Sequence, residues 1–438
     1  MQTLRDKGFA CSLETYNATD AFIGSLPGHG AANLRRPLLS SRNVAHLFPT
    51  TTPWPGDPHC QSSLFPEKSP PLLYARGRGA TPFTVNLHQG DVGHTLVVGA
   101  TGAGKSVLVG LLALSFLRYA DSRVFLFDVG RSHCIPTLAA GGNWYDFATT
   151  KALQPLRHVG DTIDRMWALD FLETVWELAG ALTNPSVRRE LGRALHLLAH
   201  ANSDDRTLTA LYVSLPAKLQ ETLEPYTVKG PYGRLLDGSS PVSAAGRIQC
   251  WELSEVLALG DAAAVPLLLT LFRSVERSLD GAPTLIVVEE AWAALLRSAF
   301  ARRLEEWLLT LRKRNAALVI VAHSPAQIRA LENRAILTES CPTKIVLPNP
   351  EAATDDNAPV YRALGLGSRE IDIVARALRR REYYFKSPSG SRLFDLNLGP
   401  VAHALLLPIP GMSVEESTAH KKDLITRYGS AFIDHLMQ

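Results

Sequence analysis

A glycine-rich segment, Gly99-Ala-Thr-Gly-Ala-Gly-Lys-Ser106, is the clearest chemical motif in the sequence. It fits the pattern G-x-x-x-x-G-K-[ST], follows the apolar run Thr95–Val98 and opens a helical pattern that starts at Lys105. Glycines at these positions let successive backbone N–H groups point inward at phosphate oxygens, and the helix N-terminus adds the positive end of its dipole. We expect Lys105 to reach the β- and γ-phosphates of a nucleotide and the Ser106 hydroxyl to bind Mg²⁺. The residues expected to bind ATP are Gly99, Ala100, Thr101, Gly102, Ala103, Gly104, Lys105, Ser106 and Val107.

Two adjacent glutamates follow another apolar run, Thr284–Val288. A nucleoside triphosphatase needs an acidic pair at a strand end, in which the first carboxylate holds Mg²⁺ and the second positions the attacking water. Glu289 takes the place of the usual aspartate and is one methylene longer, so the metal position can differ. Glu290 is the candidate catalytic base, and Ser106 and Glu289 are the candidate Mg²⁺ ligands.

The order of apolar runs indicates how these residues are positioned. Strand, loop, helix and strand follow one another from Thr95 to Asp128, which predicts a mainly parallel α/β sheet. Helical periodicity then dominates, which predicts an all-α inserted subdomain, and strand patterns return from Thr284 onwards. Glu382–Phe385 and Arg392–Leu396 predict a hairpin. The expected divisions are an N-terminal remnant with a proline-rich connector (1–71), the first section of the ATPase core with the phosphate loop (72–160), the all-α subdomain (161–280), and the second section of the core with the hairpin and tail (281–438).

Composition narrows the function classes. The net charge of +3 is close to neutral and does not indicate nucleic-acid binding. Such binding would require arginines concentrated locally, as in the lumen of an oligomeric ring. The five cysteines are scattered without a C-x-x-C pair, which argues against a disulfide framework or a zinc site. The longest apolar stretch, Val107–Leu117, is too short to span a bilayer. We therefore expect a cytoplasmic protein, attached at most peripherally to a membrane.

The motifs together resemble the CagE/TrbE/VirB family of conjugative-transfer and type IV secretion ATPases. The resemblance starts from His94–Ser106 and Val288–Trp292. Further segments in the same order are similar to the TrbE branch: Ser25–His29, Phe127–Ser132, Glu224–Tyr226, Gly230–Arg234, Leu311–Asn315, Ser340–Thr343, Leu347–Pro350, Tyr383–Pro388 and Arg392–Asp395. Each motif is modestly specific, but their ordered set covers almost the whole chain.

The resemblance implies a RecA-like P-loop ATPase core with an all-α subdomain that uses ATP and Mg²⁺. It implies a homo-oligomer, often a hexamer, in which an arginine of one subunit completes the neighbour's site, with Arg312, Arg314 and Arg381 as candidates. Other secretion-system subunits at the cytoplasmic face of the inner membrane are the implied partners. Family members are about twice as long, so the resemblance covers their C-terminal motor half and implies a truncation, a split gene product or a shortened paralogue.

Three positions depart from the family pattern. Val129 replaces an expected lysine, Glu289 an aspartate, and His323 a glutamine that is expected to sense the γ-phosphate. A histidine can still donate a hydrogen bond there, but its charge depends on pH. Besides the hydrolysing motor, two alternatives stay open: a weakly active nucleotide-binding scaffold, and a DNA-translocating motor of the HerA, FtsK or coupling-protein type, which would bind DNA in a salt-sensitive way.

Overall fold

The computed structural model describes residues 5, 11–29, 40–42, 53–239, 246–289, 306–323 and 338–437. The chain forms two compact units, Met1–Pro53 and Trp54–Gln438. Among the described residues of the first unit is helix α2 (Ala18–Gly24). The second unit holds the sheet and every candidate site residue.

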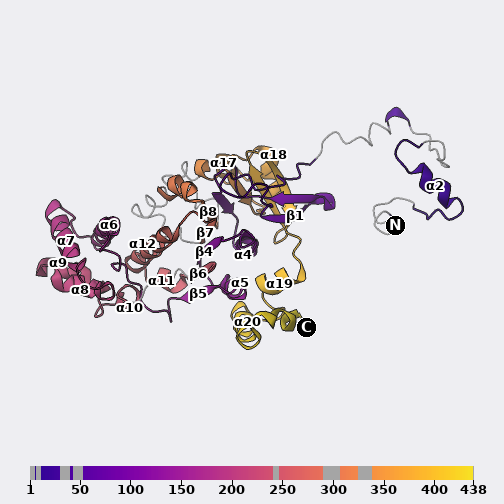
Figure 1. Cartoon of the computed structure of the whole chain (residues 1–438). Coiled ribbons are helices and arrows are strands. Elements are labelled where there is room, and N and C mark those ends of the chain that lie inside the picture. The colour runs from indigo at the N-terminus through magenta and orange to yellow at the C-terminus, as the bar shows by residue number, and fades with distance from the viewer. Residues whose placement is uncertain are drawn as a thin grey trace. The chain divides into compact units, whose positions relative to one another are not determined.

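The described strands are β1 (Leu73–Gly77), β2 (Pro82–Val85), β3 (Thr95–Val98), β4 (Arg123–Asp128), β5 (Asn143–Asp146), β6 (Ile248–Glu252), β7 (Thr284–Glu289), β8 (Ala316–Ala322), β9 (Thr343–Val346), β10 (Glu382–Ser387) and β11 (Gly390–Asp395). In the described part of the chain they form one sheet in the order β2-β1-β11-β10-β9-β3-β8-β7-β4-β6-β5 (Figure 1). The strands from β9 to β5 in this order are parallel. The remaining four extend the sheet in antiparallel fashion. Strand β3, which leads into the glycine-rich loop, thus lies inside the parallel region, between β9 and β8.

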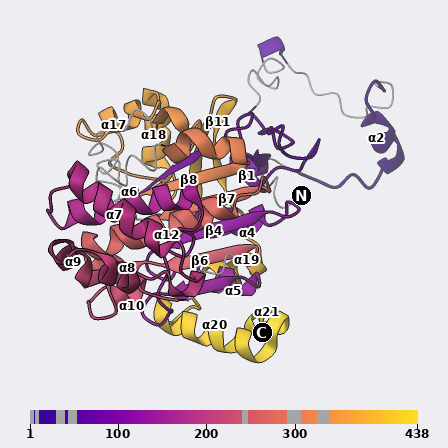
Figure 2. The ribbon, with the colours of Figure 1, turned by 60° about the vertical axis from the view of Figure 1, so that its left-hand side comes forward.

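The central parallel strands β3, β7 and β8 are mainly apolar, as expected for strands that are covered on both faces. In β8, Leu318 and Ile320 face one hydrophobic core, whereas Val319 and Val321 face the other. Helix α12 (Asp261–Ser278) packs in the first core, and α4 (Lys105–Phe116) packs in the second. Figures 1 and 2 show α12 on one face of the strands and α4 with α5 (Cys134–Ala139) on the other.

Between β5 and β6 the described residues contain helices, short 3₁₀ turns and loops, but no strand (Figure 2). The helices are α6 (Thr162–Leu178), α7 (Pro185–Leu198), α8 (Leu208–Ser214), α9 (Ala217–Leu223) and α10 (Gly233–Leu236). Side-chain caps fix two of their starts. Asp161 accepts hydrogen bonds from the backbone N–H groups of Ile163 and Asp164, and Asn184 caps α7 in the same way. These helices lie within the segment for which the sequence predicts an all-α subdomain.

The helices that follow are α11 (Ser254–Ala258), α12, α17 (Ala358–Ala363), α18 (Ser368–Arg376), α19 (Pro400–Leu406), α20 (Val414–Tyr428) and α21 (Phe432–Met437). None of the helices within the described ranges combines the length and apolar character that crossing a membrane requires.

The predicted α/β class and the C-terminal hairpin are confirmed, with Glu382 paired to Asp395 across β10 and β11. The prediction that the segment 161–280 is all-α was wrong in one detail, because strand β6 lies inside this segment and pairs with β4 and β5. Its sequence, Ile248-Gln-Cys-Trp-Glu252, mixes polar and apolar residues, and all five are buried. Pairing with β4 and β5 therefore stabilises a strand that the local residue pattern did not indicate.

The proline-rich stretch 53–72, which is described throughout, contains neither helix nor strand. From Trp54 onwards it is part of the second unit, in which the Trp54 ring contacts Phe83 and Phe385, and the Phe65 ring contacts His88 and Tyr119. The stretch is therefore irregular but anchored by aromatic contacts.

Candidate functional site

The glycine-rich loop joins β3 to α4 at the carboxyl end of the parallel strands. Gly102 and Gly104 have φ angles of 73° and 104°, in the region that residues with a Cβ rarely adopt. Gly104 is the N-cap of α4, so Lys105 and Ser106 open the helix. The Lys105 ammonium is buried inside the loop and donates hydrogen bonds to the carbonyl oxygens of Gly99 (2.9 Å) and Ala100 (3.0 Å).

A cavity of about 950 Å³ lies against this loop. It is lined by several residues predicted for the site, namely Thr101, Gly102, Gly104, Lys105, Ser106, Val107, Glu289, His323 and Arg381. Gly99, Ala100 and Ala103 complete the backbone of the same loop. The Thr101 hydroxyl lies 3.5 Å from Nδ1 of His323, so the end of β8 contacts the loop directly.

Glu289 ends β7 and is buried, with 5% of its surface exposed. Its Oε1 lies 3.3 Å from Nε2 of His133, which is buried next to Asp128 at the end of β4. Burial lowers the pKa of His133, but the negative charges of Glu289 and Asp128 outweigh it and raise this pKa above its usual value. Burial, together with the charge of Glu289, raises the pKa of Asp128. Glu290, the candidate base, lies outside the described residues.

A third carboxylate, that of Glu252 at the end of β6, holds the segment that follows β4. It accepts hydrogen bonds from the backbone N–H groups of Gly130 (3.2 Å) and Arg131 (2.7 Å). Arg131 has a φ angle of 60°, and its guanidinium lies 3.2 Å from a carboxylate oxygen of Asp146. These contacts fix Val129 in the cavity wall, where the family pattern expects a lysine.

Residues in β10 and directly before it bind the glycine-rich loop, and most of them carry no signal in the sequence that predicted this role. Arg380 donates from its backbone N–H to Ala103 O (3.2 Å) and from Nε to Gly102 O (3.0 Å), while the Tyr383 hydroxyl donates to Gly104 O (3.2 Å). Of the three arginines that precede β10, the sequence pattern singled out only Arg381. Its guanidinium forms an ion pair with Asp395 (2.8 Å) and does not bind the loop backbone as Arg380 does.

Arg312 and Arg314 lie in a 3₁₀ turn, Leu311–Arg314, that precedes β8. His323 follows the other end of this strand, so the two arginines are about 20 Å from the loop in the same chain. Both are exposed, and Arg314 donates to the carbonyl oxygen of Glu276 (3.1 Å). The fold therefore does not bring them into this chain's own site.

The C-terminal helices supply another wall, which the sequence patterns did not predict. Leu406, Leu407 and Pro408, at the end of α19, line the cavity together with Lys421 of α20. The Lys421 ammonium is buried and donates to the carbonyl oxygens of Ala404 (2.6 Å) and Leu407, which ties α20 to the end of α19. Mostly apolar side chains form this wall, which faces the phosphate loop across the cavity.

Ser106 and Glu289 offer a hydroxyl and a carboxylate, the oxygen donors that Mg²⁺ prefers. Both line the same cavity. Oε1 of Glu289 is buried and forms an ion pair with Nε2 of His133. The donor set present therefore fits a magnesium ion.

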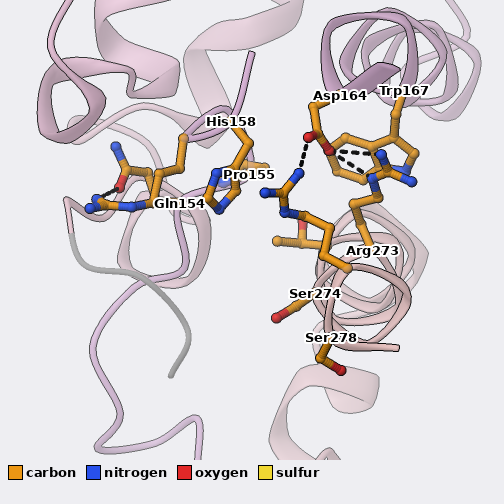
Figure 3. Close-up of a pocket in the computed structure, with 11 residues that line it drawn as sticks. Gln154, Pro155, His158, Asp164, Trp167, Arg273, Ser274 and Ser278 are labelled. Atoms are coloured by element: carbon orange, nitrogen blue, oxygen red, sulfur yellow. Dashed lines mark hydrogen bonds and ion pairs between the residues drawn. The ribbon is translucent and has the colours of Figure 1, made fainter. Parts of the chain in front are cut away.

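A second, smaller cavity of about 200 Å³ lies between the segment 154–158 and the helices α6 and α12 (Figure 3). Asp164 points from α6 toward Arg273 and Arg277 of α12, and both arginines pair with it. None of the predicted site residues lines this cavity.

Comparison with known proteins shows which proteins the chain is similar to. The chain is 39% identical to "Conjugal transfer protein TrbE" of Rhizobium radiobacter over 98% of its own length and 53% of that protein. It is 38% identical to the second segment of a probable conjugal transfer protein TrbE of Sinorhizobium fredii, over 99% of its own length and 66% of that protein. The chain thus spans between about half and two thirds of these relatives.

Among solved structures, VirB4 of Thermoanaerobacter pseudethanolicus superposes with a TM-score of 0.62 at 18% identity, covering 76% of this chain and 98% of that one. No protein-family model matches the chain. The long alignments to TrbE proteins and the shared VirB4 fold agree with the ordered motifs. The chain therefore belongs to the family of the TrbE conjugal transfer proteins and shares the fold of VirB4.

Proposed function

We propose that the chain binds and hydrolyses ATP and that it acts as a motor of a conjugative-transfer or type IV secretion system. The observation that supports this most is the shared cavity of the phosphate loop, Glu289 and His323 at the carboxyl edge of a parallel sheet. This is where α/β proteins bind nucleotides. Turnover would power pilus assembly or substrate transfer.

Each residue has a distinct role in this proposal. The loop N–H groups and Lys105 neutralise the β- and γ-phosphates, and Ser106 and Glu289 would hold Mg²⁺, which would supply further positive charge when bound. Glu290 accepts a proton from the attacking water, and His323 donates a hydrogen bond toward the γ-phosphate. The positive charges count most in the transition state, where negative charge spreads over the transferred group.

The proposal extends to assembly. An arginine that acts in a neighbouring subunit must project from a surface away from its own site, and the exposed Arg312 and Arg314 meet this condition. Arg381 meets it less well, because it lines its own cavity and pairs with Asp395. We infer a homo-oligomer, a hexamer in the family pattern, that works with other secretion-system subunits at the cytoplasmic face of the inner membrane.

Phosphate release by the purified protein tests the proposal, with Lys105→Ala as the disabling variant. The matched control is Lys344→Ala, since Lys344 of β9 is half-buried and also donates to a backbone carbonyl, that of Cys341 (3.1 Å). We expect Lys105→Ala to lose at least about 100-fold in turnover, as expected for a group that stabilises the transition state, and Lys344→Ala to keep most of it. Equal activity in the two variants would refute the assignment. Tight ATP binding without turnover in the native chain would favour the scaffold alternative.

A further inference from the structure

His133 connects the ends of two neighbouring strands. Its backbone N–H donates to Oδ2 of Asp128 (2.8 Å), which ends β4, and its Nε2 lies 3.3 Å from Oε1 of Glu289, which ends β7. All three side chains are buried. A single residue thus reaches one carboxylate through its main chain and the other through its ring.

The surroundings hold the His133 ring in place. His133 is the residue before α5, and the preceding segment is fixed by the hydrogen bonds of Gly130 and Arg131 to Glu252. On the side facing α4 the ring packs next to Gly110, where a Cβ would lie at ordinary van der Waals distance, 3.4 Å, from Nδ1. The ring therefore has little freedom to turn away from Glu289.

We propose that His133 is a positioning residue for ATP hydrolysis, which holds the Glu289 carboxylate through its ring Nε2 so that the other carboxylate oxygen faces the phosphate loop. This inference rests on the function proposed above. A glutamate at this position has one more rotatable bond than an aspartate, so its carboxylate needs an external partner to keep one orientation. His133 supplies that partner from within the protein.

The decisive test compares two amide variants that differ in reach. In His133→Gln the amide nitrogen can occupy the place of Nε2, whereas in His133→Asn it is one methylene too short to reach Glu289. The matched control is His88→Gln. His88 is also a buried histidine of this unit, but it does not line the cavity and is not one of the residues around Asp128 and Glu289. Turnover and KM for ATP are measured, together with the affinity for ADP by calorimetry with Mg²⁺ and with a chelator.

We expect His133→Asn to lose about 10–100-fold in kcat, the usual effect of removing a group that orients a ligand, and His133→Gln to stay within about threefold of the native value. In His133→Asn the gain in ADP affinity on adding Mg²⁺ should shrink, while the affinity measured with the chelator stays unchanged. A merely structural role would change the melting temperature without this selective loss.

Three results would overturn the inference. The first is native kcat and native Mg²⁺ dependence in His133→Asn, and the second is an equal loss in the Gln and Asn variants. The third is a stoichiometric transition metal in the purified protein that is bound by His133, Asp128 and Glu289. Failure of the proposed function is distinguishable, because the native chain would then release no phosphate that depends on Lys105.

Discussion

Removing the Asp164 carboxylate should destabilise the contact between helices α6 and α12. Asp164 is 3% exposed at its side chain and pairs with Arg273 (2.8 Å) and Arg277 across the α6–α12 contact (Figure 3). Asp164→Ala leaves two guanidinium groups without this partner. Removing one partner of a buried ion pair lowers the free energy of unfolding by about 3–5 kcal/mol. Because Arg273 is 17% exposed and Arg277 39%, water screens a share of that cost. We therefore expect a loss of about 2–3 kcal/mol.

The control is Asp204→Ala, which removes an ion pair with Arg157 (2.7 Å) whose carboxylate is 70% exposed. Such a pair contributes at most about 1 kcal/mol. Thermal unfolding followed by circular dichroism compares the two variants with the native chain. In a unit of this size we expect Asp164→Ala to melt about 4 °C lower and Asp204→Ala to change by about 1 °C or less. Equal melting temperatures for the two variants would refute the reasoning.

Two further predictions concern pH and the loop. Buried His94 accepts a hydrogen bond from Leu318 N–H at Nδ1 and contacts Leu308 O through Nε2, both at 3.1 Å, and burial lowers its pKa to about 4. The unfolded chain therefore binds a proton between about pH 6.5 and 4 that the folded chain does not, so stability falls as pH falls through this range. The melting temperature should drop from pH 7 to pH 5, and His94→Gln should flatten that drop; an equal drop would contradict the assignment. In Gly104→Ala, the new Cβ would meet the Tyr383 hydroxyl at 2.7 Å with φ at 104°, so ATP affinity should fall by about tenfold or more. Adding Tyr383→Phe should recover some of it by calorimetry, and no recovery would show that the hydroxyl is not the obstacle.

The sequence predicted the elements whose signals are local. The turn from β3 through the glycine-rich loop into α4 was predictable because the glycines, Lys105 and Ser106 lie close together in the sequence, and the strand and helix on either side have strong apolar patterns. The position of Glu289 at the end of a strand was predictable because it directly follows the apolar run Thr284–Val288. The parallel core followed from the same runs, since strands buried on both faces need apolar residues throughout.

The tertiary structure alone decided which distant residues complete the site. His133 reaches Glu289 across more than 150 positions, and Arg380 and Tyr383 reach the loop across more than 270. Strand β6 exists because β4 and β5 pair with it, and the wall formed at Leu406 depends on the return of the C-terminal helices. Spacing along the chain carries no information about such contacts, because strand order in the sheet differs from strand order in the sequence. Local patterns determine which elements form, and packing determines which side chains meet.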